Sequence, residues 1–177
     1  MTTASAALVD DFQSPDHLAP NGEAWRVFTD RVMGGLSRAD AFHVEEDGRR
    51  FLRLMGLVSL ANNGGFIQTA LPLGTREKPR DASAFDGIRL EVMTDDEGYA
   101  IHLRTRDCRR PWEHYKAEIP PGEGWRTVEI PFAAFGAYGL DRPLDPAALT
   151  RLGIVAGSRE FVADVRVARI EFFVAAP

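Results

Sequence analysis

Apolar and polar residues alternate with a period of two along the middle of the chain, as in strands that bury one face. Residues 88–93 and 99–106 show this alternation most clearly, and residues 112–119 and 125–130 continue it. Many short strands with little helical periodicity predict a two-layered β-sandwich or a barrel.

The same pattern, interrupted by glycine and proline, predicts the other elements. We expect strands at residues 8–12, 25–28, 41–46, 51–60, 65–71, 152–156 and 161–174, with an Asp47-Gly48 turn between the third and the fourth. A change of phase at Ala168-Arg169 predicts a β-bulge in the last strand. Asp145 followed by Pro146 is typical of a helix start, so one short helix is predicted near residues 146–151.

The connection at residues 95–98 is short and polar, which predicts a hairpin between the strands on either side. If the middle strands are neighbours in one sheet, their polar positions share one outer face. That face would hold Arg89, Glu91, His102, Arg104, His114, Lys116 and Glu118.

Two glycine pairs lie at the ends of the predicted 41–60 hairpin and suggest a rim. Glycine pairs allow positive φ angles or close backbone approach, so they form turns in a scaffold more often than ligand sites. As a binding rim, the candidate residues are Asp30, Arg31, Met33, Gly34, Gly35, Ser37, Asn62, Asn63, Gly64 and Gly65. Asp30 and Arg31 would form an ion pair that fixes the corner or present a partner contact, and Asn62 and Asn63 would cap their own turn.

These motifs resemble one family. The segments Asp-Arg-Val-Met-Gly-Gly-Leu-Ser at 30–37 and Gly-Leu-Val-Ser-Leu-Ala-Asn-Asn-Gly-Gly-Phe at 56–66 are similar to the signature of the complex I intermediate-associated proteins. Tyr-x-x-x-Leu-Arg-Thr at 99–105 and the segments at 115–118, 125–128 and 130–135 follow in the family's order. The resemblance implies a galactose-binding-like jelly-roll sandwich and a role in assembling NADH:ubiquinone oxidoreductase. At 158–161 the chain reads Ser-Arg-Glu-Phe, where the family tends to carry a glycine.

Composition limits the function classes. The chain has 177 residues, 45% of them hydrophobic, and a net charge of −5, which argues against nucleic acid as a partner. We expect residues 1–7 to be disordered and 8–177 to form one domain, without a transmembrane segment. The N-terminus resembles neither a secretory signal nor a transit peptide. A bacterial cytoplasm is therefore predicted, or the mitochondrial matrix for a processed eukaryotic protein.

The sequence carries no zinc-helix, phosphate-loop or nucleophile-elbow motif. Cys108 is the single cysteine, so no disulfide forms within the chain. As a nucleophile it would need His102 or His114 as a base, and an ordinary loop thiol is the simpler interpretation. Asp10, Asp11 and Glu171 supply too few oxygens for a calcium site, so we predict no metal, no cofactor and no catalytic residue.

Saccharide binding needs aromatic faces beside planar polar groups. Candidate residues on the sheet face are Arg104, Trp112, His102 and His114, whereas Tyr115 alternates onto the apolar side. We therefore expect a non-catalytic module that binds protein subunits, those of respiratory complex I by resemblance. The alternatives are a carbohydrate-binding module of jelly-roll type, with a glycan as ligand, and an enzyme at the glycine-rich rim.

Overall fold

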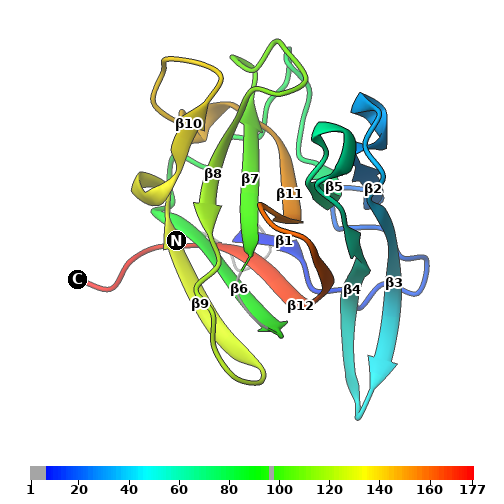
Figure 1. The fold of residues 1–177 in the computed structure, drawn as a ribbon. Helices are drawn as coiled ribbons and strands as arrows, with labels where there is room; N and C mark the ends of the chain where they lie inside the picture. The colour runs from blue at the N-terminus through cyan, green and yellow to red at the C-terminus, as the bar shows by residue number, and fades with distance from the viewer. Residues whose placement is uncertain (1–6, 96–97) are drawn as a thin grey trace.

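The computed structural model describes residues 7–95 and 98–177. Two antiparallel six-stranded sheets pack on each other (Figure 1). Sheet A has the order β3-β4-β12-β6-β9, and β1 pairs with β12. Sheet B has the order β10-β8-β7-β11-β5-β2. The predicted all-β sandwich is confirmed.

The strands of sheet A are β1 (Leu8–Asp10), β3 (Arg38–Glu46), β4 (Arg49–Val58), β6 (Gly87–Thr94), β9 (Arg126–Pro131) and β12 (Phe161–Phe173). Those of sheet B are β2 (Arg26–Thr29), β5 (Phe66–Pro72), β7 (Tyr99–Thr105), β8 (His114–Glu118), β10 (Gly136–Tyr138) and β11 (Leu149–Gly157). Four short 3₁₀ turns connect strands: η1 (Asp30–Met33), η2 (Ala61–Asn63), η3 (Phe132–Ala134) and η4 (Pro146–Ala148). In the described part of the chain, no helix is long and apolar enough to cross a membrane.

The core lies between the sheets, because each strand turns its apolar positions inward. The largest fully buried side chains include those of Ile88 and Leu90 from sheet A, and of Tyr99, Leu103 and Tyr115 from sheet B. Each polar residue between them therefore points outward, so both sheets present a chemically distinct outer face to solvent.

Several local predictions are confirmed. Asp47 and Gly48 have φ angles of 52° and 76° and turn the chain between β3 and β4. The pairing of β12 with β6 shifts register between Val167 and Arg169, which is the predicted bulge. The Asp145 carboxylate accepts a hydrogen bond from Ala147 N at 3.0 Å, as an N-cap does. The helix that follows is the 3₁₀ turn η4, and residues 149–151 begin β11.

The prediction that the middle strands share one face is wrong. β6 pairs with β12 and β9 in sheet A, whereas β7 pairs with β11 and β8 in sheet B. β6 and β7, which flank residues 95–98, lie in different sheets and do not pair, so the predicted hairpin is wrong; residues 96–97 lie outside the described part. Arg89 and Glu91 consequently lie on the outer face of sheet A. The outer face of sheet B holds His102, Arg104, His114, Lys116 and Glu118.

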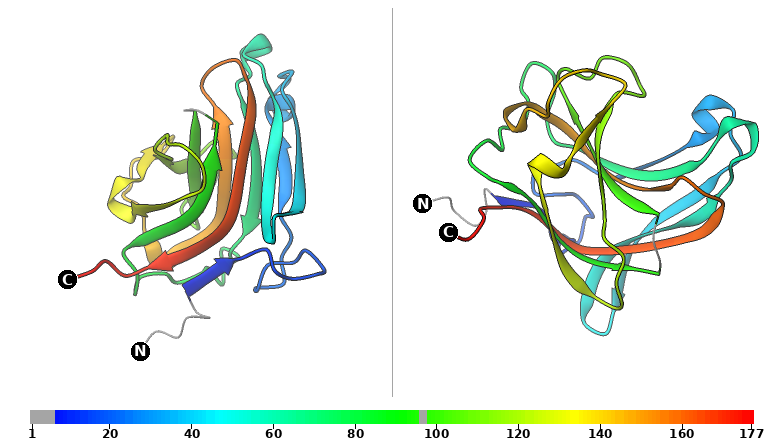
Figure 2. Two further views of the ribbon diagram at one scale, coloured as in Figure 1. Left: turned by 90° about the horizontal axis from the view of Figure 1, so that it is seen from below. Right: turned by 60° about the vertical axis from the view of Figure 1, so that its left-hand side comes forward.

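The two glycine corners meet at one end of the sandwich. η1 follows β2 and η2 follows β4, and Figure 2 shows these two turns side by side in both views. The corners therefore come together from segments that are about thirty residues apart in the chain, and this end of the fold positions the first candidate site.

Candidate functional site

One buried carboxylate joins the two corners. Asp30, the first residue of η1, is 0% exposed. Its Oδ1 accepts a hydrogen bond from Ser37 N at 2.9 Å. Its Oδ2 accepts from Gly65 N at 2.6 Å, from Phe66 N at 3.3 Å and from the Ser37 hydroxyl. Because its donors come from both corners, Asp30 holds η1 against the start of β5.

The glycine pairs are explained by this carboxylate. Gly34 and Gly65 have φ angles of 87° and 145°, which side chains disfavour. Gly35 and Gly64 do not have positive φ, but a Cβ there would lie 2.4 Å and 2.5 Å from a carboxylate oxygen of Asp30. Each pair thus supplies one residue for backbone conformation and one for close approach to Asp30.

The electrostatics of this site differ from the predicted ion pair. Burial raises the pKa of Asp30, but the hydrogen bonds from Ser37, Gly65 and Phe66 together lower it by more. The net shift of the pKa is therefore downward. Arg31 instead donates from Nε to Ser37 O at 3.2 Å, and among the described residues Asp30 forms no ion pair. The prediction of an Asp30–Arg31 pair is wrong, because backbone N–H groups satisfy the carboxylate.

The asparagines also differ from expectation. Asn62 and Asn63 have φ angles of 55° and 59°, in the left-handed region that asparagine tolerates. Asn62 Nδ2 donates to Gly34 O at 3.3 Å, so this side chain bridges the corners rather than capping its own turn. Asn63 is exposed.

Apolar side chains cover the outside of these corners. We call this surface the rim patch; its members are Val32, Met33, Leu36, Leu57, Leu60 and Val162, all exposed. Leu57 and Val162 are register partners in β4 and β12, beside the corners. Val32, Val162 and Met33 are the most exposed members, at 76%, 70% and 61%. Next to the patch lies an open hollow of about 370 Å³, lined by Thr29, Arg31, Ser37, Arg38 and Ala39.

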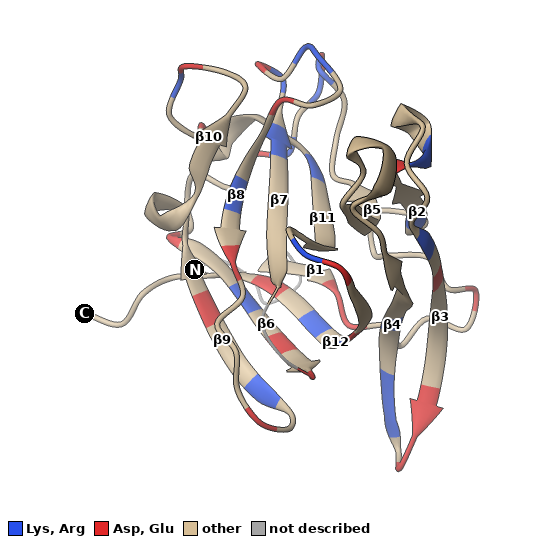
Figure 3. Cartoon of the chain, in the orientation of Figure 1, with Lys and Arg blue, Asp and Glu red and all other residues tan. Residues whose placement is uncertain are grey.

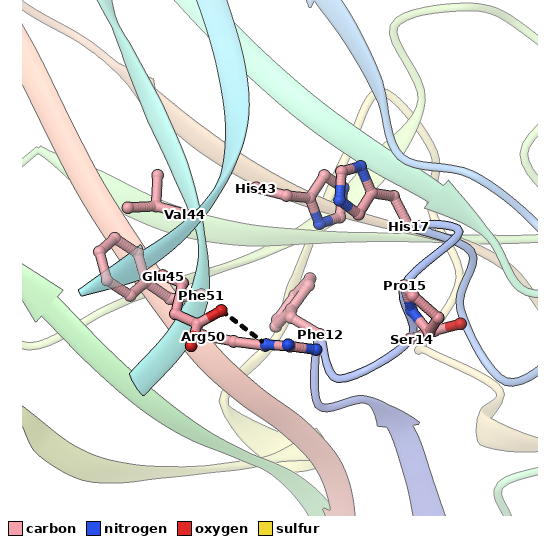
Figure 4. A pocket seen from close by; sticks show the side chains of 9 residues that line it. All are labelled: Phe12, Ser14, Pro15, His17, His43, Val44, Glu45, Arg50 and Phe51. Carbon is pink, nitrogen blue, oxygen red and sulfur yellow. Dashed lines mark hydrogen bonds and ion pairs between the residues drawn. The ribbon is translucent and has the colours of Figure 1, made fainter. Parts of the chain in front are cut away.

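A second hollow, of about 260 Å³, lies between residues 12–17 and the β3–β4 hairpin (Figure 4). His17 and His43 stack there at 4.1 Å between ring centroids, and Arg50 pairs with Glu45 at 3.2 Å. Burial lowers the pKa of His43, and His17 lowers it further. No residue predicted from the sequence lines this hollow, since no local pattern relates two histidines from separate elements.

On the outer face of sheet B, three rings form a stack. The His102 and His114 rings lie 4.0 Å apart, and Tyr138 stacks on His114 at 4.9 Å. The sequence analysis missed Tyr138 because residues 131–145 have no alternating pattern; in the structure β10 pairs Tyr138 with His114. Trp112 is 53% exposed and lies beside Gly139, under the Arg110 guanidinium, so it is outside the stack.

The imidazoles of this stack are uncharged at neutral pH. Burial lowers the pKa of His102 to about 3, and the nearby His114, Lys116 and Arg151 contribute in the same direction. Burial also lowers the pKa of His114. The stack is thus a neutral aromatic surface beside cationic side chains. Arg104 is held there by a hydrogen bond from its Nη2 to Arg110 O at 3.0 Å.

The remaining candidates are occupied by structural contacts. Cys108 and Tyr115 are buried in the core. Asp10 accepts hydrogen bonds from Phe12 N and Trp25 Nε1, both at 2.9 Å. Glu171 pairs with arginines of β6 and β12. Across residues 7–95 and 98–177, no three His, Cys, Asp or Glu side chains are grouped as a metal site would need.

The two sheets and their connections define a galactose-binding-like jelly roll, the sandwich of many carbohydrate-binding modules. The chain belongs to the family of complex I intermediate-associated protein 30 (CIA30), whose model matches residues 11–166. The family predicted from the glycine motifs is therefore confirmed.

Solved structures show the same fold at low sequence identity. A family 11 carbohydrate-binding module from Clostridium thermocellum, in complex with a β-1,3-1,4-mixed-linked tetrasaccharide, has a TM-score of 0.69 at 16% identity, covering 96% of this chain and 95% of that one. The family 11 module of the C. thermocellum cellulase Lic26A-Cel5E has a TM-score of 0.70 at 17% identity, with 95% and 94% covered. A family 30 module of the same organism has a TM-score of 0.55 at 16% identity, with 78% and 83% covered. No curated protein matches the chain.

Proposed function

We propose that this protein is a non-catalytic binding module that associates with subunits of respiratory complex I during assembly and contacts them through the rim patch. The main evidence is the rim patch itself, a cluster of exposed apolar side chains on the two corners that Asp30 joins. Large apolar groups gathered at one place on a soluble surface mark a protein interaction site. Membership of the CIA30 family supports complex I subunits as the class of partner.

The base of the patch is fixed before any partner arrives. Asp30 ties both corners together, and Asn62 adds a contact to Gly34 O. An interface that is already ordered loses less conformational entropy on binding. Arg31 and Arg38 line the adjacent hollow and supply a polar border, as at other protein interfaces.

The absence of a catalytic role is part of the proposal. Asp30 accepts hydrogen bonds on both carboxylate oxygens and is closed to solvent, so it is not positioned to act as a base at the rim. The Cys108 thiol is buried, which is unlike an accessible nucleophile. We place the protein where complex I is assembled, in a bacterial cytoplasm or a mitochondrial matrix.

The test is affinity purification of the tagged protein from its native host, followed by mass spectrometry for complex I subunits. Val32→Glu with Met33→Glu places two charges in the patch, and we expect it to abolish recovery of those subunits. Val174→Glu is the control for a charge at an exposed apolar position, since Val174 is 57% exposed and follows the C-terminal end of β12, away from the patch. Failure to recover complex I subunits with the unaltered protein would overturn the proposal, as would equal recovery by the patch variant.

A second function is supported by a separate observation. The neutral stack of His102, His114 and Tyr138 on sheet B presents an aromatic surface with arginines beside it. We propose saccharide binding there as the alternative role, since sugar rings stack on aromatic faces and hydrogen-bond to planar polar groups. Titration with a panel of oligosaccharides tests it. Specific binding that is lost in Tyr138→Ala supports it, and no binding by any saccharide refutes it.

A further inference from the structure

The outer face of sheet B carries two arginines that have no carboxylate partner. Arg104 in β7 and Arg151 in β11 are register partners, so their side chains leave the sheet side by side. Arg104 donates to the backbone carbonyls of Cys108 and Arg110. The Arg151 guanidinium lies 5.4 Å from the ring centroid of Phe28. Among the described residues, neither arginine forms an ion pair.

The arginines of three sheet A strands are different, although they belong to the same acidic protein. Every arginine of β4, β6 and β12 has a carboxylate within 4.0 Å; the six are Arg49, Arg50, Arg53, Arg89, Arg166 and Arg169. Figure 3 shows the contrast: β6, β9 and β12 carry both colours, whereas β7 and β11 carry blue bands. Arg38 in β3 and Arg126 in β9 also form no ion pair among the described residues, but these strands are at opposite edges of sheet A. The local feature of sheet B is therefore that two arginines without an ion pair, Arg104 and Arg151, are adjacent.

The outer face of sheet B disfavours the charged form of Arg151. Burial lowers the pKa of Arg151, and Arg104 lowers it further. Glu118, at the end of β8, is paired with Lys116 at 2.9 Å. Glu113, just before β8, accepts hydrogen bonds from Arg109 N and Arg110 N, and the charge of Arg104 contributes to lowering its pKa without forming an ion pair. Half-buried like charges repel each other unless an anion lies between them. Two guanidinium groups on neighbouring strands are suited to an incoming carboxylate, with which they form strong charge-assisted hydrogen bonds.

A second, independent observation comes from Gln68 in β5. This side chain is only 7% exposed, and its Oε1 has no hydrogen-bond partner among the described residues. It lies over Gly153, where a Cβ would be 2.5 Å from Oε1. Gly153 is the register partner of His102 and is two residues from Arg151. A buried acceptor without a donor is unusual, and a ligand hydroxyl would satisfy it.

We propose that the outer face of sheet B binds a saccharide that contains uronic acid. Its carboxylate lies between Arg104 and Arg151, a hydroxyl donates to Gln68, and a sugar ring stacks on Tyr138 at the end of the aromatic stack. This inference rests on the second function proposed above and narrows its substrate class. An acidic peptide would also match the charge, but the stack and the orphaned amide favour a polyhydroxylated ring.

Isothermal titration of the full chain with oligogalacturonate and with its carboxyl-reduced counterpart tests the inference. The two ligands share linkage and ring stereochemistry and differ at C6, where a neutral hydroxymethyl group replaces the carboxylate. We expect the acidic form to bind at least about tenfold more tightly, since charge-assisted hydrogen bonds are lost in the reduced form. Arg104→Gln combined with Arg151→Gln removes this preference. Arg49→Gln, at an exposed arginine of β4 on the other sheet, leaves it unchanged.

Four further results would overturn or check the inference. Equal binding of both forms would overturn the acidic ligand while leaving saccharide binding intact. Failure of every saccharide would overturn both. Equal affinity for polyglutamate would show an anion site without sugar recognition, which also contradicts the inference. Arg151→Lys is a check against loss of folding, because it keeps the charge; it retains preference for the acid if charge carries recognition.

Discussion

The two outer sheet faces satisfy charge in opposite ways. On sheet A, the arginines of β4, β6 and β12 form ion pairs with carboxylates, and Arg53 pairs in bidentate fashion with Asp164 at 3.0 Å and 2.7 Å. On sheet B, Arg104 and Arg151 stand next to each other, with backbone carbonyls and an aromatic ring as neighbours. Both faces belong to one sandwich and have the same backbone geometry. The difference teaches that sheet A has electrostatics suited to stability, whereas sheet B retains a charge that folding does not need.

Asp30 extends the comparison to a third case, a buried charge satisfied without any counter-ion. Its hydrogen bonds come from backbone N–H groups and one hydroxyl at the point where β2 and β3 pass from one sheet to the other. Replacing each kind of charge by a neutral group should therefore give different changes in the free energy of unfolding.

The largest loss is expected for Asp30→Ala. It removes the acceptor of Ser37, Gly65 and Phe66, which leaves the buried N–H of Ser37 and the partly buried N–H groups of Gly65 and Phe66 without partners. Each unsatisfied donor costs about 1–3 kcal/mol, so we expect unfolding in urea to lose about 3 kcal/mol or more. Asp40→Ala, at an exposed position of β3, removes the same charge and should change stability little. Similar values for the two variants would show that the network contributes nothing.

The next effect is the pH dependence from His102. Its folded pKa of about 3 is far below its ordinary value of 6.5, so the unfolded state binds a proton between these values and the folded state does not. The free energy of unfolding therefore falls as pH decreases from 6.5 towards 3, and the contribution is complete above 6.5. His102→Gln should flatten this slope in urea titrations at several pH values. An unchanged slope would mean that His102 is not protected from protonation.

Removing one charge of an ion pair on sheet A should lower the free energy of unfolding by a smaller amount. Arg53→Met leaves Asp164 with only the longer contact to Arg166, at 3.7 Å. Both partners are about a quarter exposed, so we expect a loss of about 1–2 kcal/mol, between the values for surface and buried pairs. High salt should reduce the loss, because screening weakens the pair in the unaltered protein. A loss near zero would remove the contrast between the sheets.

Local features of the fold were predictable from the sequence, and features that depend on distant partners were not. The phase change at Ala168 predicted the bulge, because alternation is a property of adjacent residues. The glycine pairs predicted corners, but not that both pack on Asp30, since sequence does not reveal which corners meet. For the same reason, the sequence suggested the neighbouring Arg31 as the ion-pair partner of Asp30. Alternation identified the outer positions of β6 and β7 without revealing that they face opposite sides of the sandwich.

The candidate sheet-face residues show the same limit. His102, Arg104 and His114 were selected by residue type, and they do lie together on sheet B. Tyr138 and Gln68 were not selected, because each joins the group only through pairing with another strand. A group of residues that comes from five strands has no regular spacing in the sequence, so no single segment could have predicted it.

The smallest effect, and the most direct comparison, is expected for Arg151→Met. The substitution matches Arg53→Met but removes a charge that has no partner in the described structure and that burial already disfavours. Methionine retains an apolar chain to pack on Phe28, so we expect a change within about 0.5 kcal/mol, in either direction. Measured side by side in urea, the two variants separate a charge that stabilises the fold from one that does not. If Arg151→Met costs as much as Arg53→Met, then Arg151 stabilises the folded chain, and its lack of a carboxylate partner no longer points to a ligand.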